Sequence, residues 1–184
     1  MRYPSLWIIL TLGIFTTIIG FSYKITPSYS QFNVTGPQDQ EAVVKANLDR
    51  FDTLDFDAFS NQNFTLFNEI HGPDVKVVWP DGRQTTGIEK HDKDLKAFFA
   101  YAPDTRIKVH PIKFGSGNWT AATGIMTGTF SKPMSLANGS IIQPTGKPFN
   151  VTMATIAKWD NGRITEEHLF WDNGAFMKQI GLSK

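Results

Sequence analysis

The chain has 184 residues, 41% of them hydrophobic and 13% aromatic, so it is long enough to bury one good core and one domain is the default. Its formal net charge of +1 provides no electrostatic footprint for nucleic acid, so we expect no nucleic-acid partner. The absence of cysteine excludes a disulfide, a thiolate nucleophile and a cysteine-ligated metal. Stability must therefore come from packing.

The N-terminus predicts a targeting segment over residues 1–30. Arg2 supplies a positive start, and a mostly apolar stretch follows it. Small residues before Gln31 offer a cleavage point, whereas Lys24 suits an uncleaved anchor in which residues 4–23 tether the chain to a membrane. Both alternatives predict an exported protein, secreted or membrane-anchored and facing outside.

After a Pro- and Gly-containing linker over residues 31–38, we expect a single domain over residues 39–184. Apolar spacing first predicts helices, at residues 39–54, 56–67 and 88–101, with a hairpin at residues 75–86 between the second and the third. The pattern then alternates with period two, which predicts strands at residues 106–114, 119–130, 149–159 and 164–171. Helices followed by antiparallel strands indicate an α+β domain with helices on one face of a curved sheet.

Several short motifs follow one another in a fixed order along the chain. They are Gly72-Pro73-Asp74-Val75, Pro80-Asp81-Gly82, Gly128-Thr129, Pro144-Thr145-Gly146-Lys147, Asp160-Asn161-Gly162-Arg163-Ile164 and Gln179-Ile180-Gly181-Leu182. Each motif alone is weak, but the ordered set resembles the SnoaL-like polyketide cyclases, also called ester cyclases, of the nuclear transport factor 2-like (NTF2-like) superfamily. The likeness covers about residues 40–182.

This resemblance implies a cone, formed by a curved antiparallel sheet packed with three N-terminal helices around an apolar pocket. It also implies a homodimer, because members of the family commonly pair through the outer face of the sheet. Relatives of this shape include cyclases, isomerases, dehydratases and epoxide hydrolases, as well as proteins without catalysis. The fold therefore limits the function without naming it.

Asp172 is the first candidate for catalysis, because it matches the acidic residue that the cyclases use as acid and base. A carboxylate in an apolar cavity is poorly solvated, which makes it a stronger base. The alternative is that Asp172 caps a terminal helix around residues 175–180, a position that favours aspartate for its own reasons.

His168 lies four residues before Asp172, so in an extended strand both side chains share one face with Phe170 and Glu166. We expect this face to line the pocket, with His168 orienting the carboxylate or donating to a developing enolate. A wall residue with a satisfied hydrogen bond is an equal alternative for His168. By the same parity, Trp171 should lie on the outer side of the sheet.

Other aromatic and imidazole side chains are candidates for binding a substrate. Trp79 and Trp119 could line a pocket for a flat ligand, although most tryptophans serve in cores or interfaces. His71 precedes a helix-to-strand junction and could face the pocket or simply occupy a turn. His91 lies in a polar helical stretch, which predicts exposure, and His110 could face either side of its strand.

No sequence motif indicates a metal or a cofactor. The four histidines form neither a pair spaced by four residues on a helix nor a His-Glu-x-x-His signature, so we expect no metal site. Nucleophile-elbow, P-loop and dinucleotide fingerprints are also missing from the sequence.

Three functions remain open. The first is a cofactor-independent enzyme that performs cyclisation, isomerisation or dehydration on a small carbonyl-containing, polyketide-like compound. The second is a non-catalytic extracellular module that binds an apolar ligand or another protein, and the third is a dimerisation domain whose own side chains fill the pocket. A cavity with convergent polar groups favours catalysis, an open apolar pocket favours binding, and a filled interior favours dimerisation.

Overall fold

The computed structural model describes residues 36–136 and 138–183. Its helices are α1 (Pro37–Thr53), the π-helix η1 (Leu54–Phe59), α2 (Phe64–Ile70), α3 (Ile88–Tyr101) and α4 (Asn173–Gln179). The predicted targeting segment, residues 1–30, lies outside the described residues. Among the described helices, none is both long and apolar enough to cross a membrane.

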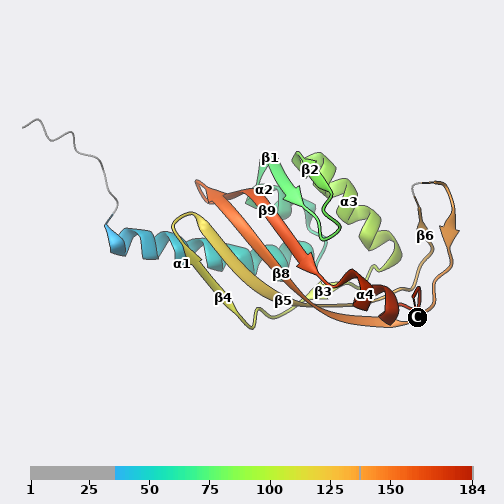
Figure 1. Cartoon of the computed structure of the whole chain (residues 1–184). Coiled ribbons are helices and arrows are strands. Elements are labelled where there is room, and N and C mark those ends of the chain that lie inside the picture. The colour runs from blue at the N-terminus through green and yellow to red at the C-terminus, as the bar shows by residue number, and fades with distance from the viewer. Residues whose placement is uncertain (1–35, 137, 184) are drawn as a thin grey trace, which may run out of the picture. The chain divides into compact units, whose positions relative to one another are not determined.

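A large sheet forms the other half of the domain (Figure 1). Its strands are β1 (His71–Val78), β2 (Gln84–Thr86), β3 (Arg106–Ile107), β4 (Lys113–Ser116), β5 (Trp119–Thr129), β8 (Pro148–Asp160) and β9 (Arg163–Trp171). They pair in the order β2-β1-β9-β8-β5-β3, with β4 also on β5. The pairing is antiparallel except between β1 and β9, which run parallel. A separate hairpin joins β6 (Met134–Ser135) to β7 (Ile141–Ile142).

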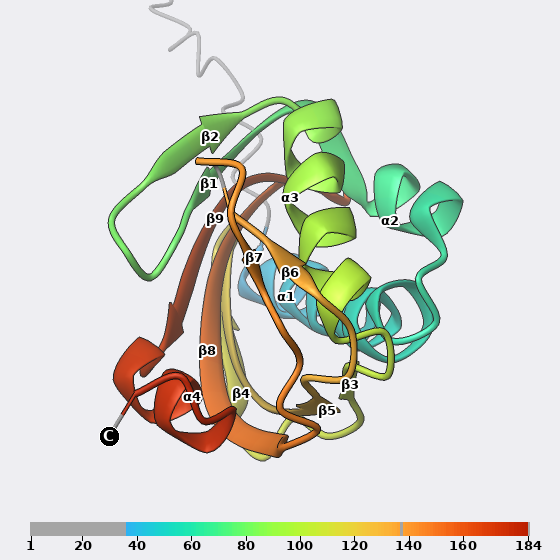
Figure 2. The ribbon, with the colours of Figure 1, turned by 90° about the vertical axis from the view of Figure 1, so that its right-hand side faces the viewer.

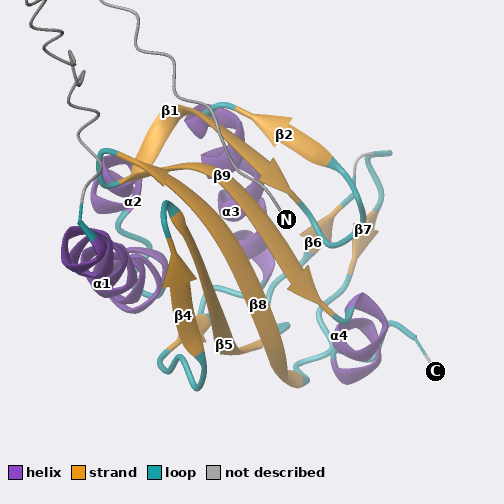
Figure 3. Ribbon diagram, turned by 60° about the vertical axis from the view of Figure 1, so that its left-hand side comes forward, coloured by secondary structure: helices purple, strands orange, loops and turns teal. Residues whose placement is uncertain are grey.

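The helices α1, α2 and α3 lie on one side of the strongly bent sheet (Figure 2). Strand β8 shows why: its residues alternate between buried and exposed over most of its length, so one face is apolar and needs a cover. Figure 3 shows β8 and β9 curving across the domain, with α1 beside β4 and α4 at the end of β9. The predicted α+β class, a curved and mainly antiparallel sheet packed with three N-terminal helices, is confirmed.

Local sequence explains most element boundaries. The last hairpin turns at Asn161 and Gly162, whose φ angles of 47° and 73° suit a type I′ turn, as the Asp-Asn-Gly sequence predicts. The single strand predicted at residues 106–114 is divided into β3 and β4. Pro111 lies in the gap between these two strands, where its missing N–H cannot break a ladder.

The first predicted helix is prolonged by a π-helix, which the sequence did not indicate. The N–H of Ser60 donates to the carbonyl oxygen of Asp55 across five residues, at 3.1 Å. The Ser60 hydroxyl donates to the same carbonyl at 2.6 Å and accepts from the N–H of Ile107 at 2.8 Å. Ser60 therefore joins the π-helix to β3 in the buried interior, and it fixes the backbone of Asp55.

Replacing Ser60 by alanine is expected to lower the free energy of unfolding by about 1–3 kcal/mol, because the buried N–H of Ile107 loses its partner. Urea unfolding followed by circular dichroism measures the change. Thr53→Ala is the matched control, since the Thr53 hydroxyl bonds a carbonyl on the exposed side of α1. If both variants lost the same free energy of unfolding, the hydrogen bonds of Ser60 would add no more stability than that of the exposed Thr53.

Candidate active site

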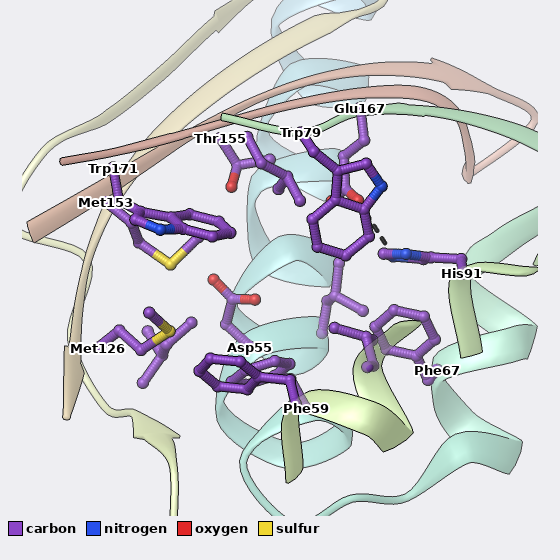
Figure 4. Close-up of a pocket in the computed structure, with 15 residues that line it drawn as sticks. Asp55, Phe59, Phe67, Trp79, His91, Met126, Met153, Thr155, Glu167 and Trp171 are labelled. Carbon is purple, nitrogen blue, oxygen red and sulfur yellow. Dashed lines mark ion pairs between the residues drawn. The ribbon is translucent and has the colours of Figure 1, made fainter. Parts of the chain in front are cut away.

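A cavity of about 80 Å³ is lined by side chains of the helices and of the inner face of the sheet. Most of its lining is apolar or aromatic, and the polar side chains that reach it are those of Asp55, His91, Thr155 and Glu167. Figure 4 shows the Asp55 carboxylate pointing into the space between Met126, Trp171 and Trp79. The interior is thus neither filled nor purely apolar, and polar groups from four different elements converge on it.

The Asp55 carboxylate belongs to a hydrogen-bonded chain that leads out of the cavity. Its Oδ2 lies 2.8 Å from Nε2 of His110, and Nδ1 of the same imidazole lies 2.8 Å from Oδ1 of Asp52. Lys113 in turn donates to the other oxygen of Asp52. Only 2% of the His110 side chain is exposed, with the ring held against those of Phe51 and Phe56. This Asp-His-Asp arrangement orients one carboxylate toward the cavity and the other toward solvent.

The environment shifts the pKa values of Asp55 and Asp52 in opposite directions. Burial raises the pKa of Asp55, and the hydrogen bond with His110 offsets only part of that increase. Burial also acts to lower the pKa of His110, but the hydrogen bonds and charges of Asp55 and Asp52 outweigh it, so the net pKa is raised. At Asp52, Lys113 and His110 outweigh partial burial and lower the pKa. Asp55 is consequently the better proton carrier and Asp52 the permanent negative charge.

A second group of titratable side chains lies at the other end of the cavity. Oε2 of Glu167 on β9 lies 3.4 Å from Nε2 of His91 on α3 and 3.8 Å from Nε2 of His71 on β1. Nδ1 of His71 lies 2.9 Å from the carbonyl oxygen of Phe67, so it carries the proton there and leaves Nε2 directed at the carboxylate. All three side chains are almost wholly buried.

Glu167 differs from Asp55 in its ionisation. Burial alone would raise the pKa of Glu167, but the imidazoles of His71 and His91 outweigh it and lower the pKa to about 2. The cavity thus holds one carboxyl group whose pKa is raised by burial and another that stays ionised. Carboxyl pairs whose environments separate their pKa values in this way are typical of acid/base sites.

The structure places Asp172 and His168 outside this cavity. Asp172 is exposed and caps α4, its Oδ1 accepting from the N–H of Ala175 at 2.8 Å. His168 lies on the outer face of the sheet, where its Nε2 is 2.9 Å from Oε1 of Glu166. Phe170, 49% exposed, also lies on that face. The predicted face is therefore wrong, and the capping alternative describes the geometry of Asp172.

The error comes from Asp172, from which the faces of β9 are counted: it lies beyond the strand as a helix cap, so it does not mark the inward face. A β-bulge also changes the parity of this strand. Ile164 pairs with Trp159 and Glu166 pairs with Lys158, so Thr165 is an extra residue on this strand. A bulge exchanges the two faces of a strand beyond it. Residues that would have shared the inward face of Ile164 point outward, and the inward side chains are those of Glu167, Leu169 and Trp171. Trp171 accordingly lines the cavity, contrary to the prediction.

The other predicted binding residues divide between the two faces. Trp79 lines the cavity, and His71 lies behind it against Glu167. Trp119 lies on the outer face, with its ring centroid 6.4 Å from that of His168. His91 is 2% exposed, so its predicted exposure is wrong. Trp119 and Phe170 thus give the outer face of the sheet aromatic side chains. The expected homodimer through this face stays a prediction.

Asp172→Ala is expected to lower the free energy of unfolding by about 0.5–2 kcal/mol, the usual cost of a lost helix cap. Chemical denaturation measures it, and Asp160→Ala is a suitable control because Asp160 is exposed in the last hairpin. Since Asp172 does not line the cavity, ligand binding inside should be unchanged. If Asp172→Ala kept the wild-type stability but lost ligand binding, Asp172 would have to be counted among the candidate site residues.

The sequence reasoning missed Asp55, Glu167 and the role of His110. One local signal was present: Asp55 lies between Leu54 and Phe56, in a segment over residues 51–59 where acidic and apolar residues are interspersed. Asp52 also precedes it by one helical turn. No spacing rule could link them to His110, which is 55 residues away from Asp55 and meets it only through the fold.

Solved structures of the same shape share little sequence with this chain. A provisionally named SnoaL-like polyketide cyclase from Jannaschia sp. CCS1 has a TM-score of 0.67 at 20% identity, covering 77% of this chain and 96% of its own. IdmH of Streptomyces antibioticus, also a provisional polyketide cyclase, has a TM-score of 0.62 at 23% identity, covering 73% and 98%. A provisional polyketide cyclase from Xanthomonas campestris pv. campestris has a TM-score of 0.65 at 12% identity. The match covers 74% of this chain and 98% of that protein. At these identities the likeness shows the fold alone.

Among curated proteins, none matches this chain. The model of the SnoaL-like polyketide cyclase family matches residues 51–180, which is well over half of the chain and includes Asp55, His91, His110 and Glu167. Sheet order, concave cavity and family match agree with one another. The chain therefore belongs to the SnoaL-like polyketide cyclase family.

Proposed function

We propose that this protein catalyses proton transfer on a small carbonyl compound, as a cyclase or isomerase does, with Asp55 as the acid and base. The observation that carries the proposal is the largely buried Asp55 carboxylate, which projects into a mostly apolar cavity while His110 lies 2.8 Å from its Oδ2. A carboxylate so placed is weakly solvated and fixed in orientation, and both properties favour general base catalysis.

The reaction needs no oxidant or reductant. Asp55 removes a proton from the carbon next to a carbonyl, and the electron pair of the C–H bond moves to the carbonyl oxygen to give an enolate. The protonated Asp55 then returns the proton to another carbon in an isomerisation, or to the oxygen formed when the enolate carbon attacks a second carbonyl in a cyclisation. His110, held by Asp52, keeps the carboxylate oriented throughout.

The size of the cavity limits the substrate. The cavity measures about 80 Å³. Drug-sized ligands need pockets of about 300 Å³ or more. We therefore propose small carbon acids, such as 1,3-dicarbonyl compounds of about five carbons, or larger molecules of which only the reacting group enters the cavity.

The test is deuterium exchange. The full-length chain is incubated in D₂O with a panel of small 1,3-dicarbonyl compounds and hydroxyketones, and loss of the α-proton signal is followed by NMR. We expect at least one compound to exchange faster than in buffer with the same mass of albumin. If every compound that quenches the cavity tryptophans exchanges only at the buffer rate, the protein binds ligands without catalysis, the second function that the apolar lining favours.

The exchange rate should rise with pH across the raised pKa of Asp55, because only the ionised carboxylate removes a proton. The groups that set this pKa are His110 and His71, which lower it, and Glu167, which raises it together with burial. The acid limb should therefore lie above the ordinary carboxyl range near pH 4. His110→Gln removes the imidazole that lowers the pKa of Asp55, so the acid limb of the pH profile should move to higher pH. A pH profile of the exchange rate tests both, and an unshifted limb would contradict the role of His110.

A further inference from the structure

We infer that His71, His91 and Glu167 form a binding site for one divalent transition-metal ion, such as Zn²⁺ or Co²⁺. The three residues come from β1, α3 and β9, and one donor atom of each lies within 4.8 Å of the other two. Two imidazoles and one carboxylate are a ligand set that Zn²⁺ and other first-row ions accept.

The distances fit a shared ion better than direct hydrogen bonds. His91 Nε2 and His71 Nε2 lie 3.4 and 3.8 Å from Glu167 Oε2, and both distances are long for a charge-assisted hydrogen bond. Ligand bonds of about 2.1 Å at a tetrahedral angle place two donor atoms roughly 3.4 Å apart. Small side-chain rotations would thus bring the three donors to bonding distance of one ion.

An unpartnered buried atom provides an independent observation. In the described part of the chain, Nε2 of His71, the nitrogen that faces Glu167, is a buried side-chain atom without a hydrogen-bond partner. Such an atom costs free energy unless a ligand satisfies it. Moreover, the Nδ1–H of His71 donates to the carbonyl oxygen of Phe67 at 2.9 Å, which fixes the tautomer whose Nε2 carries the lone pair. Metal-bound histidines are commonly oriented in this way.

The position of the site gives the ion an open side. Glu167 and His91 line the cavity, whereas His71 closes the site from behind with a side chain that is 0% exposed. Three protein ligands leave at least one coordination position, which faces the cavity that Asp55 shares (Figure 4). An ion there would accept a carbonyl or water oxygen and polarise it. Metal binding itself does not rest on the proposed function.

The experiment uses the full-length chain without a polyhistidine tag, stripped with a chelator. Co²⁺ titration followed by visible absorption, and Zn²⁺ competition against a chromophoric chelator, measure stoichiometry and affinity. We expect one equivalent per chain and a tetrahedral or five-coordinate Co²⁺ spectrum without thiolate bands, because the chain has no cysteine. Second-sphere changes weaken metal binding by about 10–100-fold, so Glu167→Gln, which removes a ligand, should weaken it at least as much.

Two outward-facing residues provide matched controls. Glu166→Gln, the control for Glu167→Gln, neutralises the neighbouring glutamate on the opposite face of β9. His168→Phe is the control for His91→Phe, which removes one imidazole ligand and should also weaken metal binding. Neither control should change Zn²⁺ affinity. Circular dichroism establishes that each variant is folded, and X-ray absorption of the Co²⁺-loaded wild type identifies its nitrogen and oxygen ligands independently of any variant.

Absence of binding by the wild type, equal affinities in Glu167→Gln and Glu166→Gln, or X-ray absorption with fewer than two imidazoles would overturn the inference. Failure of the metal site is distinguishable from failure of the proposed reaction. Asp55→Asn should lose proton exchange and keep Co²⁺ binding, because Asp55 is not among the three ligands.

Discussion

Asp55→Asn is expected to lower the enzyme-catalysed rate of carbon–hydrogen exchange by about 10²–10⁴-fold, the usual contribution of a positioned acid or base. The amide has almost the same shape as the carboxylate and can still accept a hydrogen bond from His110 in place of the 2.8 Å contact. It cannot accept a proton from carbon. The loss should therefore appear in kcat, with substrate affinity largely unchanged.

Asp172→Asn is the control for this variant, because Asp172 is a carboxylate of the same chain that caps α4 outside the cavity. It should keep the wild-type exchange rate. If Asp172→Asn lost activity and Asp55→Asn kept it, the assignment of the active site to the cavity would be wrong. Tryptophan fluorescence quenching by the same compounds gives the affinity in both variants, since Trp79 and Trp171 line the cavity.

Trp159→Ala is expected to cost about 3–5 kcal/mol of unfolding free energy, as large aromatic deletions in cores do. Trp159 is 2% exposed on the inner face of β8. Its indole N–H donates to the Thr120 hydroxyl at 2.8 Å, and its ring meets that of Phe51 edge-on at 6.3 Å. The change therefore leaves a cavity between sheet and α1 and an unpaired hydroxyl. That loss is a large part of the 5–15 kcal/mol by which domains are stable.

Trp119→Ala provides the comparison, because Trp119 lies on the outer face of β5, only part-buried, opposite Lys158 of β8. In a monomer it should cost markedly less than Trp159→Ala. Urea unfolding gives both values. Sedimentation of the two variants also tests the expected homodimer: if the outer face pairs, Trp119→Ala should shift the chain toward monomer, and Trp159→Ala should not do so while folded.

The sequence predicts the order of helices and strands well, because their signals are local. Apolar spacing in α3 and alternation in β5 and β8 depend on residues a few positions apart, and the Asp-Asn-Gly turn depends on three. The parallel pairing of β1 with β9 could not be seen in this way, because its partners lie about 90 residues apart. It was the resemblance to a family, not periodicity, that indicated the cone.

The candidate site was less predictable for two physical reasons. The family resemblance places Asp172 at the site, so counting by two from it puts His168 on the inward face of β9. Asp172 instead caps α4, and the inward residues of the strand are those of the other parity, Glu167 among them. In addition, the groups that meet in the cavity come from separate elements. His91 looks like a surface residue in its polar stretch, and only the packing of α3 on β1 buries it beside Glu167.

The π-helix after α1 bears on how such a site could arise. A π-turn contains one residue more than an α-turn, and such turns occur frequently at functional sites. Deleting one residue from Leu54–Phe59 would restore a regular helix, with its outer parts still able to pack, and would rotate Asp55 away from the cavity. The extra residue of the π-turn thus helps to set the direction of the Asp55 side chain. If Asp55 is the acid and base, relatives that lack the extra residue of the π-turn should bind ligands without catalysis.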